Sequence, residues 1–260
     1  MSAPAAITEW DYSGIVAAAY DQYFGAEPYW DQPFFTARLH ANGGSALELA
    51  CGTGRLLLPL LRDGLAVEGL DTSTDMLAIL RRKAAAMGLS PVLHQLPMQR
   101  FDLPARYRTV FIPAGTIHIV VGDDELDATL DCCLRALAPG GELLVPLDPV
   151  PPAIDPPGRW RERRRVHVPD YAADLRIDER QEIDAAGLVH WHLRYEVLRG
   201  GQEPEVFYRP HLLRHHRPDD FAARLVARGF AQVTMRRGYT DSDAADPAAD
   251  VIFSARCSFD

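Results

Sequence analysis

The stretch LELACGTGR, residues 47–55, decides the fold of this chain. A short apolar run ends in a turn that contains two glycines, and an apolar helical pattern begins near Arg55. This order predicts a strand, a tight turn and a helix. Small residues at Ala50, Gly52 and Gly54 let a ligand contact the backbone, because side-chain bulk there would hold the ligand away.

Strands and helices alternate from this turn onward. Strands are expected over residues 45–50, 65–70, 92–95, 109–113 and 142–147, and helices over residues 75–87 and 123–137. This alternation predicts an α/β fold with a parallel sheet and right-handed crossovers. In such a sheet ligands bind beyond the carboxyl ends of the strands, and the first strand-to-helix turn is the usual nucleotide site.

The pattern changes after Asp148, where five prolines stand within residues 149–157. Prolines at this density continue neither a helix nor a central strand, so we expect a linker or a lid hinge. Three strands that form an antiparallel insertion are then expected, over residues 175–183, 189–198 and 205–213. A helix over residues 218–228 and strands over residues 230–236 and 250–257 follow.

Composition and charge exclude several classes of protein. The 260 residues are 47% hydrophobic and 24% charged, which is typical of a globular chain. There is no apolar run near the roughly 20 residues of a membrane helix and no signal-peptide pattern, so we expect a cytoplasmic protein that does not bind membranes. The net charge of −9 argues against nucleic acid as a partner. Four cysteines without ligand spacing argue against a disulfide scaffold or a metal site.

The glycine spacing narrows the choice of ligand. Leu57 stands where a G-x-G-x-x-G loop needs its third glycine, which disfavours NAD, FAD and a nucleotide-dependent oxidoreductase. A phosphate-binding loop of the G-x-x-x-x-G-K-[ST] type needs a lysine, and this loop has none.

LELACGTGR instead resembles the first motif of class I S-adenosylmethionine-dependent methyltransferases of the small-molecule type. The stretch VEGLDTSTDML, residues 67–77, is similar to the family's pattern at the end of the second strand, where a carboxylate binds the cofactor's ribose hydroxyls. Asp71 stands at that position, and a carboxylate can accept both hydroxyl hydrogens. The resemblance extends from about Tyr12 to Cys257. It implies a Rossmann-like, mostly parallel seven-stranded sheet between helices, with the antiparallel insertion between strands five and six and the last strand antiparallel.

The resemblance also implies where the cofactor, S-adenosylmethionine, would bind. Pro97 stands where these families often carry an acidic residue near the adenine, so adenine contact would rest on backbone groups and Gln99. Arg108 stands where the fourth strand often begins with aspartate. The residues that we assign to the cofactor are Glu48, Ala50, Gly52, Gly54, Arg55, Asp71, Thr72, Met76, Met98, Gln99, Tyr12 and Tyr23.

Several of these assignments have a structural alternative. The loop with Gly52 and Gly54 is alternatively an ordinary tight turn, and Asp71 is alternatively a solvated turn residue. Glu48 either holds the loop and, through water, the cofactor's amino group, or only bonds nearby backbone amides. Aromatic residues gather between Tyr12 and Trp30, either as a lid over the methionine end of the cofactor or as a helix buried against the sheet. Tyr20 and Tyr23 are the stronger lid residues, because they stand three apart on one helical face.

The catalytic candidates are His118 and Tyr20. His118 follows the fourth strand, where it would act as a general base or orient the substrate, with a structural histidine as the alternative. The arginine run at residues 159–165 either steers an anionic substrate or is a solvated, mobile lid face. Insertion residues whose contact with substrate stays open are His167, His190, His192, Tyr195, Tyr208 and His211.

The expected reaction is methyl transfer to nitrogen or oxygen of a small polar metabolite, by in-line displacement in a lidded site. The alternatives are another use of the same cofactor, such as intramolecular cyclisation or aminopropyl-type transfer, and a non-catalytic binding module. One domain over residues 1–260 is expected, with an N-terminal helical lid (1–44), a cofactor-binding core (45–148), a substrate cap (149–216) and a C-terminal helix and strand pair (217–260). Whether the chain forms a homodimer stays open.

Overall fold

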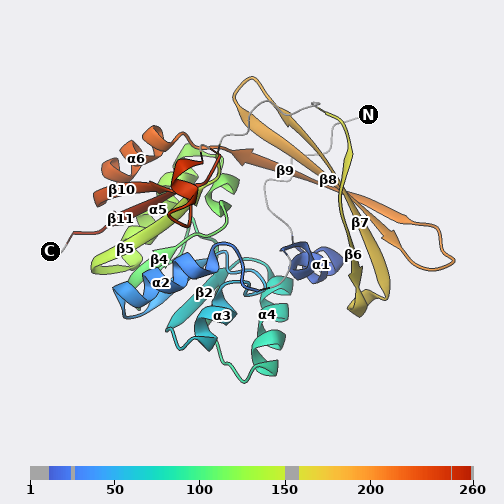
Figure 1. The fold of residues 1–260 in the computed structure, drawn as a ribbon, viewed down its shortest axis with the longest axis horizontal. Coiled ribbons are helices and arrows are strands. Elements are labelled where there is room, and N and C mark those ends of the chain that lie inside the picture. Colours follow the sequence, from blue (N-terminus) through green and yellow to red (C-terminus); the bar gives the residue numbers. More distant parts are fainter. Residues whose placement is uncertain (1–11, 25–26, 150–157, 247, 259–260) are drawn as a thin grey trace.

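The computed structural model describes residues 12–24, 27–149, 158–246 and 248–258, which form two sheets (Figure 1). The larger sheet has seven strands in the order β10-β11-β5-β4-β1-β2-β3. Their bounds are β1 (Ala46–Leu49), β2 (Val67–Asp71), β3 (Leu93–Gln95), β4 (Tyr107–Phe111), β5 (Leu137–Leu147), β10 (Ala231–Arg237) and β11 (Val251–Arg256). Strands β1 to β5 run parallel, and β11 runs antiparallel to β5 and β10. The expected Rossmann-like sheet, with its last strand antiparallel, is confirmed.

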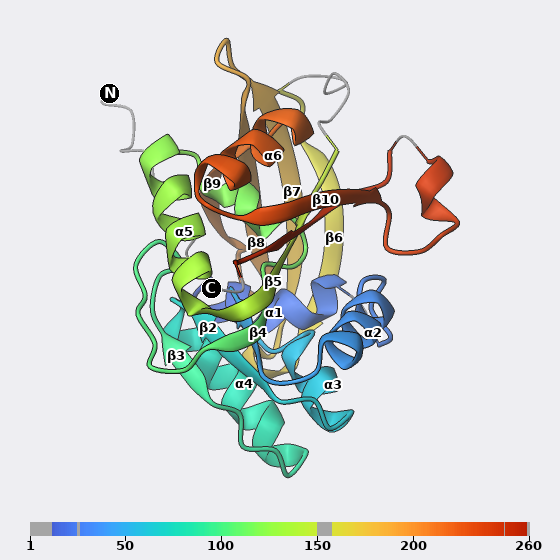
Figure 2. The same cartoon turned by 90° about the vertical axis from the view of Figure 1, so that its left-hand side faces the viewer.

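Helices cover both faces of the large sheet (Figure 2). They are α2 (Gln32–Asn42), α3 (Leu57–Arg62), α4 (Thr74–Ala86), α5 (Asp123–Ala136) and α6 (Pro218–Ala227). Successive side chains of a strand point to opposite faces, so Val110 packs with apolar residues of α5 and α6, while Phe111 packs with those of α2, α3 and α4. Helix α2, which was expected to belong to the lid, is therefore part of the core.

The smaller sheet lies between β5 and β10 in the sequence, as expected. It consists of β6 (Arg161–Val168), β7 (Ala173–Ile183), β8 (Leu188–Leu198) and β9 (Glu205–Arg214), paired antiparallel in that order. Strand β6 was not expected, because it contains the arginine run. Arg161 and Arg163 form ion pairs with the buried Glu179 of β7, so part of this run is fixed in a sheet rather than a solvated face. The proline-rich hinge falls mainly on residues 150–157, which lie outside the described residues.

Helix α1 (Gly14–Phe24) lies between the small sheet and the loops of the large sheet (Figure 1). Its apolar face, with Ile15, Val16 and Ala19, packs against small-sheet residues such as Leu175. Its polar face is held by Asp21, which accepts hydrogen bonds from Thr53 Oγ1 at 2.5 Å and from Lys83 Nζ at 2.6 Å. The Gly14 N–H also donates to Asp75 Oδ2 of α4, at 2.7 Å. Helix α1 is thus the part of the N-terminal segment that covers the glycine loop.

None of the helices in the described part of the chain has the length and apolar character needed to cross a membrane.

Candidate active site

Asp71, the last residue of β2, joins two loops at the carboxyl edge of the large sheet. Its Oδ2 accepts a hydrogen bond from the Gly52 N–H and its Oδ1 accepts one from the Ser73 N–H, each at 2.8 Å. Burial raises the pKa of Asp71, and these amides act in the opposite direction. Each carboxylate oxygen keeps a second lone pair, so the group can also accept hydrogen bonds from the hydroxyls of a ligand.

The two glycines of the loop have different surroundings, although both have left-handed φ values. A Cβ atom at Gly52 would lie 3.9 Å from Met76 Cε and 3.9 Å from Tyr20 Cε1, which are ordinary contacts. A Cβ atom at Gly54 would lie 2.9 Å from leucine Cγ atoms of α3 and α4, closer than side chains approach. Gly52 therefore has free room on a face bounded by Met76 and Tyr20, whereas Gly54 allows α3 and α4 to pack closely.

Two alanines with left-handed φ values mark the loops that follow β1 and β4. Ala50 has a φ of 56° and Ala114 a φ of 55°. Such a conformation costs a non-glycine residue about 1–3 kcal/mol, and strained residues of this kind cluster at functional sites. Both loops open at the edge of the sheet where ligands bind in this fold class.

Glu48 has a buried carboxylate oxygen that needs a partner. The side chain lies on β1 and is 2% exposed, and its Oε2 has no hydrogen-bond partner among the described residues. Burial raises the pKa of Glu48 well above its usual range, and Arg55 opposes this shift. A buried carboxylate oxygen without a hydrogen-bond partner is stabilised when a ligand brings a cation or a hydrogen-bond donor to it.

Arg55 forms an ion pair with Asp31, the residue just before α2. Its two terminal nitrogens donate to the Asp31 carboxylate at 2.6 and 2.7 Å, and the pair is buried. The guanidinium also lies over the rings of Tyr29, at 5.1 Å, and Trp30, at 4.6 Å. This bidentate pair joins the glycine loop to α2, so the arginine assigned to the cofactor also has a structural role.

Two further residues assigned to the cofactor, Thr72 and Met98, follow β2 and β3 in the sequence. Thr72 is exposed, and Met98 is buried. Gln95, which the sequence did not single out, donates from Nε2 to the Thr72 carbonyl at 3.3 Å and to Thr74 Oγ1 at 2.8 Å. Gln95 ends the third strand, and its position at the sheet edge was the signal that could have identified it.

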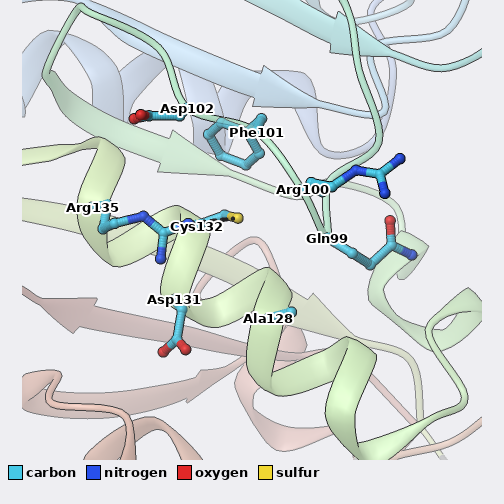
Figure 3. A pocket seen from close by; sticks show the side chains of 8 residues that line it. All are labelled: Gln99, Arg100, Phe101, Asp102, Ala128, Asp131, Cys132 and Arg135. Carbon is cyan, nitrogen blue, oxygen red and sulfur yellow. Dashed lines mark hydrogen bonds between the residues drawn. The ribbon is translucent and has the colours of Figure 1, made fainter.

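Gln99 lies at the rim of a cavity of about 320 Å³ beside α5 (Figure 3). The other lining residues are Arg100, Phe101, Asp102, Ala128, Asp131, Cys132 and Arg135. Gln99 is the only residue assigned to the cofactor that lines it, so this cavity is separate from the space over Gly52.

The aromatic residues of the N-terminal segment meet the loops. Tyr20 faces Gly52, and the Tyr12 ring packs edge-on against Tyr20 with 5.4 Å between centroids. The Tyr12 carbonyl accepts a hydrogen bond from Ser73 Oγ at 2.7 Å. Burial raises the pKa of Tyr20, so its hydroxyl stays protonated at neutral pH. The side chain of Tyr23 lies outside the described part of the structure.

His118 is buried, and both of its ring nitrogens have main-chain partners. Its Nδ1 lies 2.9 Å from the Arg214 carbonyl, and its Nε2 accepts a hydrogen bond from the Asp148 N–H at 2.9 Å. Burial and the neighbouring His215 lower the pKa of His118 to about 3. This arrangement leaves no ring nitrogen for a substrate proton and favours the structural alternative over the general base.

The insertion brings one of its six open candidates to this region. The buried His211 ring stacks on Tyr12 at 6.5 Å between centroids and lies 5.8 Å from the Trp191 ring. Tyr195 belongs to the core of the small sheet. The others have partners on the outer parts of the sheet: His167 with Asp174, His190 with Asp184, and Tyr208 with Trp160. Burial lowers the pKa of the half-buried His192.

Comparison with known proteins agrees with this geometry. Residues 46–141 match a family model described as a methyltransferase domain. Over 141 residues the chain is 36% identical to dTDP-3-amino-3,6-dideoxy-alpha-D-glucopyranose N,N-dimethyltransferase of Streptomyces fradiae, and the match covers 52% of this chain and 54% of that protein. The chain thus spans about half the length of the curated relatives it matches.

Solved structures share the fold over nearly the whole chain. An S-adenosylmethionine-dependent methyltransferase from Clostridium acetobutylicum superimposes with a TM-score of 0.76 at 16% identity, covering 93% of this chain and 97% of that one. The sugar N-methyltransferase KedS8 from Streptoalloteichus superimposes with a TM-score of 0.75 at 19% identity, covering 99% of each chain. Residues 46–141 are thus similar to methyltransferase domains, and the chain shares its fold with S-adenosylmethionine-dependent methyltransferases of known structure.

Proposed function

We propose that this chain transfers the methyl group of S-adenosylmethionine to nitrogen or oxygen of a small polar metabolite by in-line displacement. The observation that carries the proposal is the buried Glu48 oxygen, which has no partner among the described residues, beside a glycine loop with room for a ligand. S-adenosylmethionine has an α-ammonium group that would supply the missing cation. It also has a ribose diol for which Asp71 has free lone pairs.

In this proposal, the residues around the space over Gly52 bind and orient the cofactor. Asp71 would hold the ribose, the Gly52 backbone would allow close approach, and Glu48 would hold the ammonium group. When bound, the cofactor supplies a methyl group on a positively charged sulfur, which is already activated. The protein therefore has to align the acceptor and exclude water, and Tyr20 over Gly52 suits this role.

A small molecule as acceptor is supported by two features. Helix α1 contacts the glycine loop and packs on its other face against the small sheet, and a covered site of this kind suits a small acceptor. Relatives whose names specify an acceptor include an amino-sugar N,N-dimethyltransferase and a sugar N-methyltransferase. Both names specify nitrogen as the atom that accepts the methyl group, which favours nitrogen over oxygen as the acceptor atom for this chain.

The proposal is tested by calorimetry with S-adenosylmethionine, S-adenosylhomocysteine and NAD. We expect micromolar affinity for the two sulfur nucleosides, about −8 kcal/mol, and much weaker binding of NAD. Glu48→Gln should weaken S-adenosylmethionine binding, with the exposed Asp63→Asn as the matched control. Tight NAD binding without a response to either sulfur nucleoside would overturn the proposal.

Turnover is tested with labelled-methyl cofactor and a small-molecule extract. Transfer of label to a small product supports methyl transfer, and the mass of that product separates it from cyclisation or aminopropyl-type transfer. Cofactor binding without any labelled product would instead support a non-catalytic binding module.

A further inference from the structure

Two aspartates that play no part in the cofactor assignment meet at the carboxyl edge of the large sheet. Asp148 directly follows β5, and Asp250 directly precedes β11. The antiparallel register pairs Leu147 with Val251, so the next position along this ladder brings Asp148 and Asp250 opposite each other. This edge lies beside the loop that follows β4, at the same carboxyl edge of the parallel strands as Gly52 and Asp71.

The surroundings of Asp148 fix its carboxylate at that loop. A Cβ atom at Gly115 would clash with both carboxylate oxygens of Asp148, so the carboxylate lies directly against the Gly115 backbone. The Asp148 N–H is bonded to His118 Nε2. His118 thus holds the main chain at the position from which the Asp148 carboxylate projects.

The two carboxylates have no cationic partner in the described part of the chain. The buried Asp31 is neutralised by Arg55, but neither Asp148 nor Asp250 forms an ion pair with a described arginine or lysine. Burial and the charge of Asp148 raise the pKa of Asp250 to about 6. Burial also raises the pKa of Asp148, although the neighbouring His215 acts in the opposite direction. Uncompensated negative charge at a half-buried position is stabilised by a cation.

Two further polar atoms at this edge lack partners among the described residues. The hydroxyl of Tyr239, a residue that is 9% exposed, has no hydrogen-bond partner, and neither has the buried Nδ1 of His215. Burial, the charges of Asp250, Asp31 and Asp148, and an interaction of the hydroxyl with the Asp250 side chain raise the pKa of Tyr239, so its hydroxyl faces Asp250. A buried polar atom without a partner is costly, and a ligand that hydrogen-bonds to it removes the cost.

We propose that Asp148 and Asp250 bind the acceptor as an ammonium cation, with the Tyr239 hydroxyl and His215 Nδ1 as further hydrogen-bonding groups. The substrate class is then a small molecule with a basic amine. This inference rests on the proposed methyltransferase function and specifies its acceptor.

The same carboxylates account for the proton that the acceptor must lose. An ammonium nitrogen has no free electron pair and cannot act as a nucleophile. One N–H bond breaks, the proton passes to an oxygen of Asp250, and the electron pair stays on nitrogen. The products of this transfer are a neutral carboxylic acid and a neutral amine, which is the nucleophilic form.

The test uses the full chain saturated with S-adenosylhomocysteine and two probes of the same shape, cyclohexylamine and cyclohexanol. At pH 7 the amine carries a positive charge and the alcohol does not. Ligand-observed NMR should detect the amine at least about tenfold more tightly bound than the alcohol, because only the amine pairs with the carboxylates. Asp148→Asn and Asp250→Asn should each reduce this preference, and the double variant should abolish it.

The controls separate this inference from the function on which it rests. The exposed Asp219→Asn, in the first turn of α6, should keep the full preference for the amine. Unchanged S-adenosylhomocysteine affinity and a melting temperature no lower than that of the parent would show that the variants are folded. Failure of the parent to bind S-adenosylhomocysteine would refute the proposed function itself. Equal binding of both probes, or no binding of either, by a parent that does bind S-adenosylhomocysteine would refute the amine site alone.

Discussion

Replacing Asp71 with asparagine separates the two tasks that this carboxylate performs. In the structure it accepts one hydrogen bond from each of two loops, through the Gly52 and Ser73 amides. An asparagine of the same shape keeps one carbonyl oxygen for one of these amides and turns an N–H2 group toward the other. For a ribose diol it offers one accepting atom where the carboxylate offers two.

The size of the effect follows from the hydrogen bonds that are lost. A hydrogen bond to a charged group contributes about 1.5–3 kcal/mol, and the asparagine loses one such bond to the ribose. The dissociation constant should therefore rise by about 10- to 150-fold. The asparagine also loses one of the two hydrogen bonds that join the loops, which lowers the stability of the ligand-free protein. This loss is partly offset, because burial disfavours the carboxylate charge that the asparagine removes. We therefore expect only about 1 kcal/mol of lost stability.

Calorimetry with S-adenosylhomocysteine measures the first effect, and urea unfolding of the ligand-free protein measures the second. Asp63→Asn, an exposed change at the end of α3, is the matched control and should alter neither value. If Asp71→Asn unfolds with lower stability but binds S-adenosylhomocysteine like the parent, Asp71 only joins the loops and the ribose assignment is wrong.

Three other predictions concern groups with contrasting surroundings. Gly54→Ala should cost about 2 kcal/mol or more of stability, because its Cβ would meet leucines of α3 and α4 at a left-handed φ. Gly52→Ala should mainly weaken S-adenosylhomocysteine binding, because its Cβ would occupy the free room over the loop. Equal losses of melting temperature in the two variants would contradict this difference. His118→Asn should lower stability by about 1–2 kcal/mol, because its main-chain hydrogen bonds are lost. Any loss of turnover per folded molecule should not depend on pH, because His118 only positions the main chain at Asp148. A loss of turnover that follows a histidine-like pKa would restore His118 as a base. Asp250 has its pKa raised to about 6 from 3.8, so the stability gained from its protonated form is present below pH 3.8 and lost as the pH rises through about 6. Scanning calorimetry should therefore show that Asp250→Asn melts at a higher temperature than the parent at pH 7.5 but not at pH 3.5. A gain in melting temperature of the same size at both pH values would count against the titration of Asp250.

Local pattern was enough to predict the part of the fold to which we assign the cofactor. The strand, turn and helix around residues 47–55 follow one another in sequence, and so do those around residues 67–77. Each of these units is specified by apolar runs, glycines and caps that lie close together, such as Ser73, whose hydroxyl accepts the Met76 N–H. The amino-acid sequence alone therefore suffices to place the two loops that Asp71 joins.

Other features depend on contacts between distant parts of the chain. The role of His118 is set by the carbonyl of Arg214, 96 residues away, which no local pattern reveals. Asp148 and Asp250 meet because of the register between β5 and β11. Strand β6 was missed because its arginines have a polar pattern, and the buried Glu179 that neutralises two of them lies on the next strand. Asp148 could have been noted from its place after the fifth strand, by the same rule that selected His118.

Helix α1 contacts both the glycine loop and the small sheet, so we expect it to couple binding of the proposed cofactor and acceptor. One face of the helix is fixed by Asp21 to Thr53, next to Gly52, and the opposite face carries the small sheet that holds His211 against Tyr12. A ligand at the glycine loop that stabilises α1 in this position therefore also stabilises the roof over the acceptor. Thermodynamic reciprocity then requires the acceptor to tighten cofactor binding by the same factor by which the cofactor tightens acceptor binding. We therefore expect the proposed cofactor and acceptor to bind cooperatively, because one helix contacts the regions where both would lie.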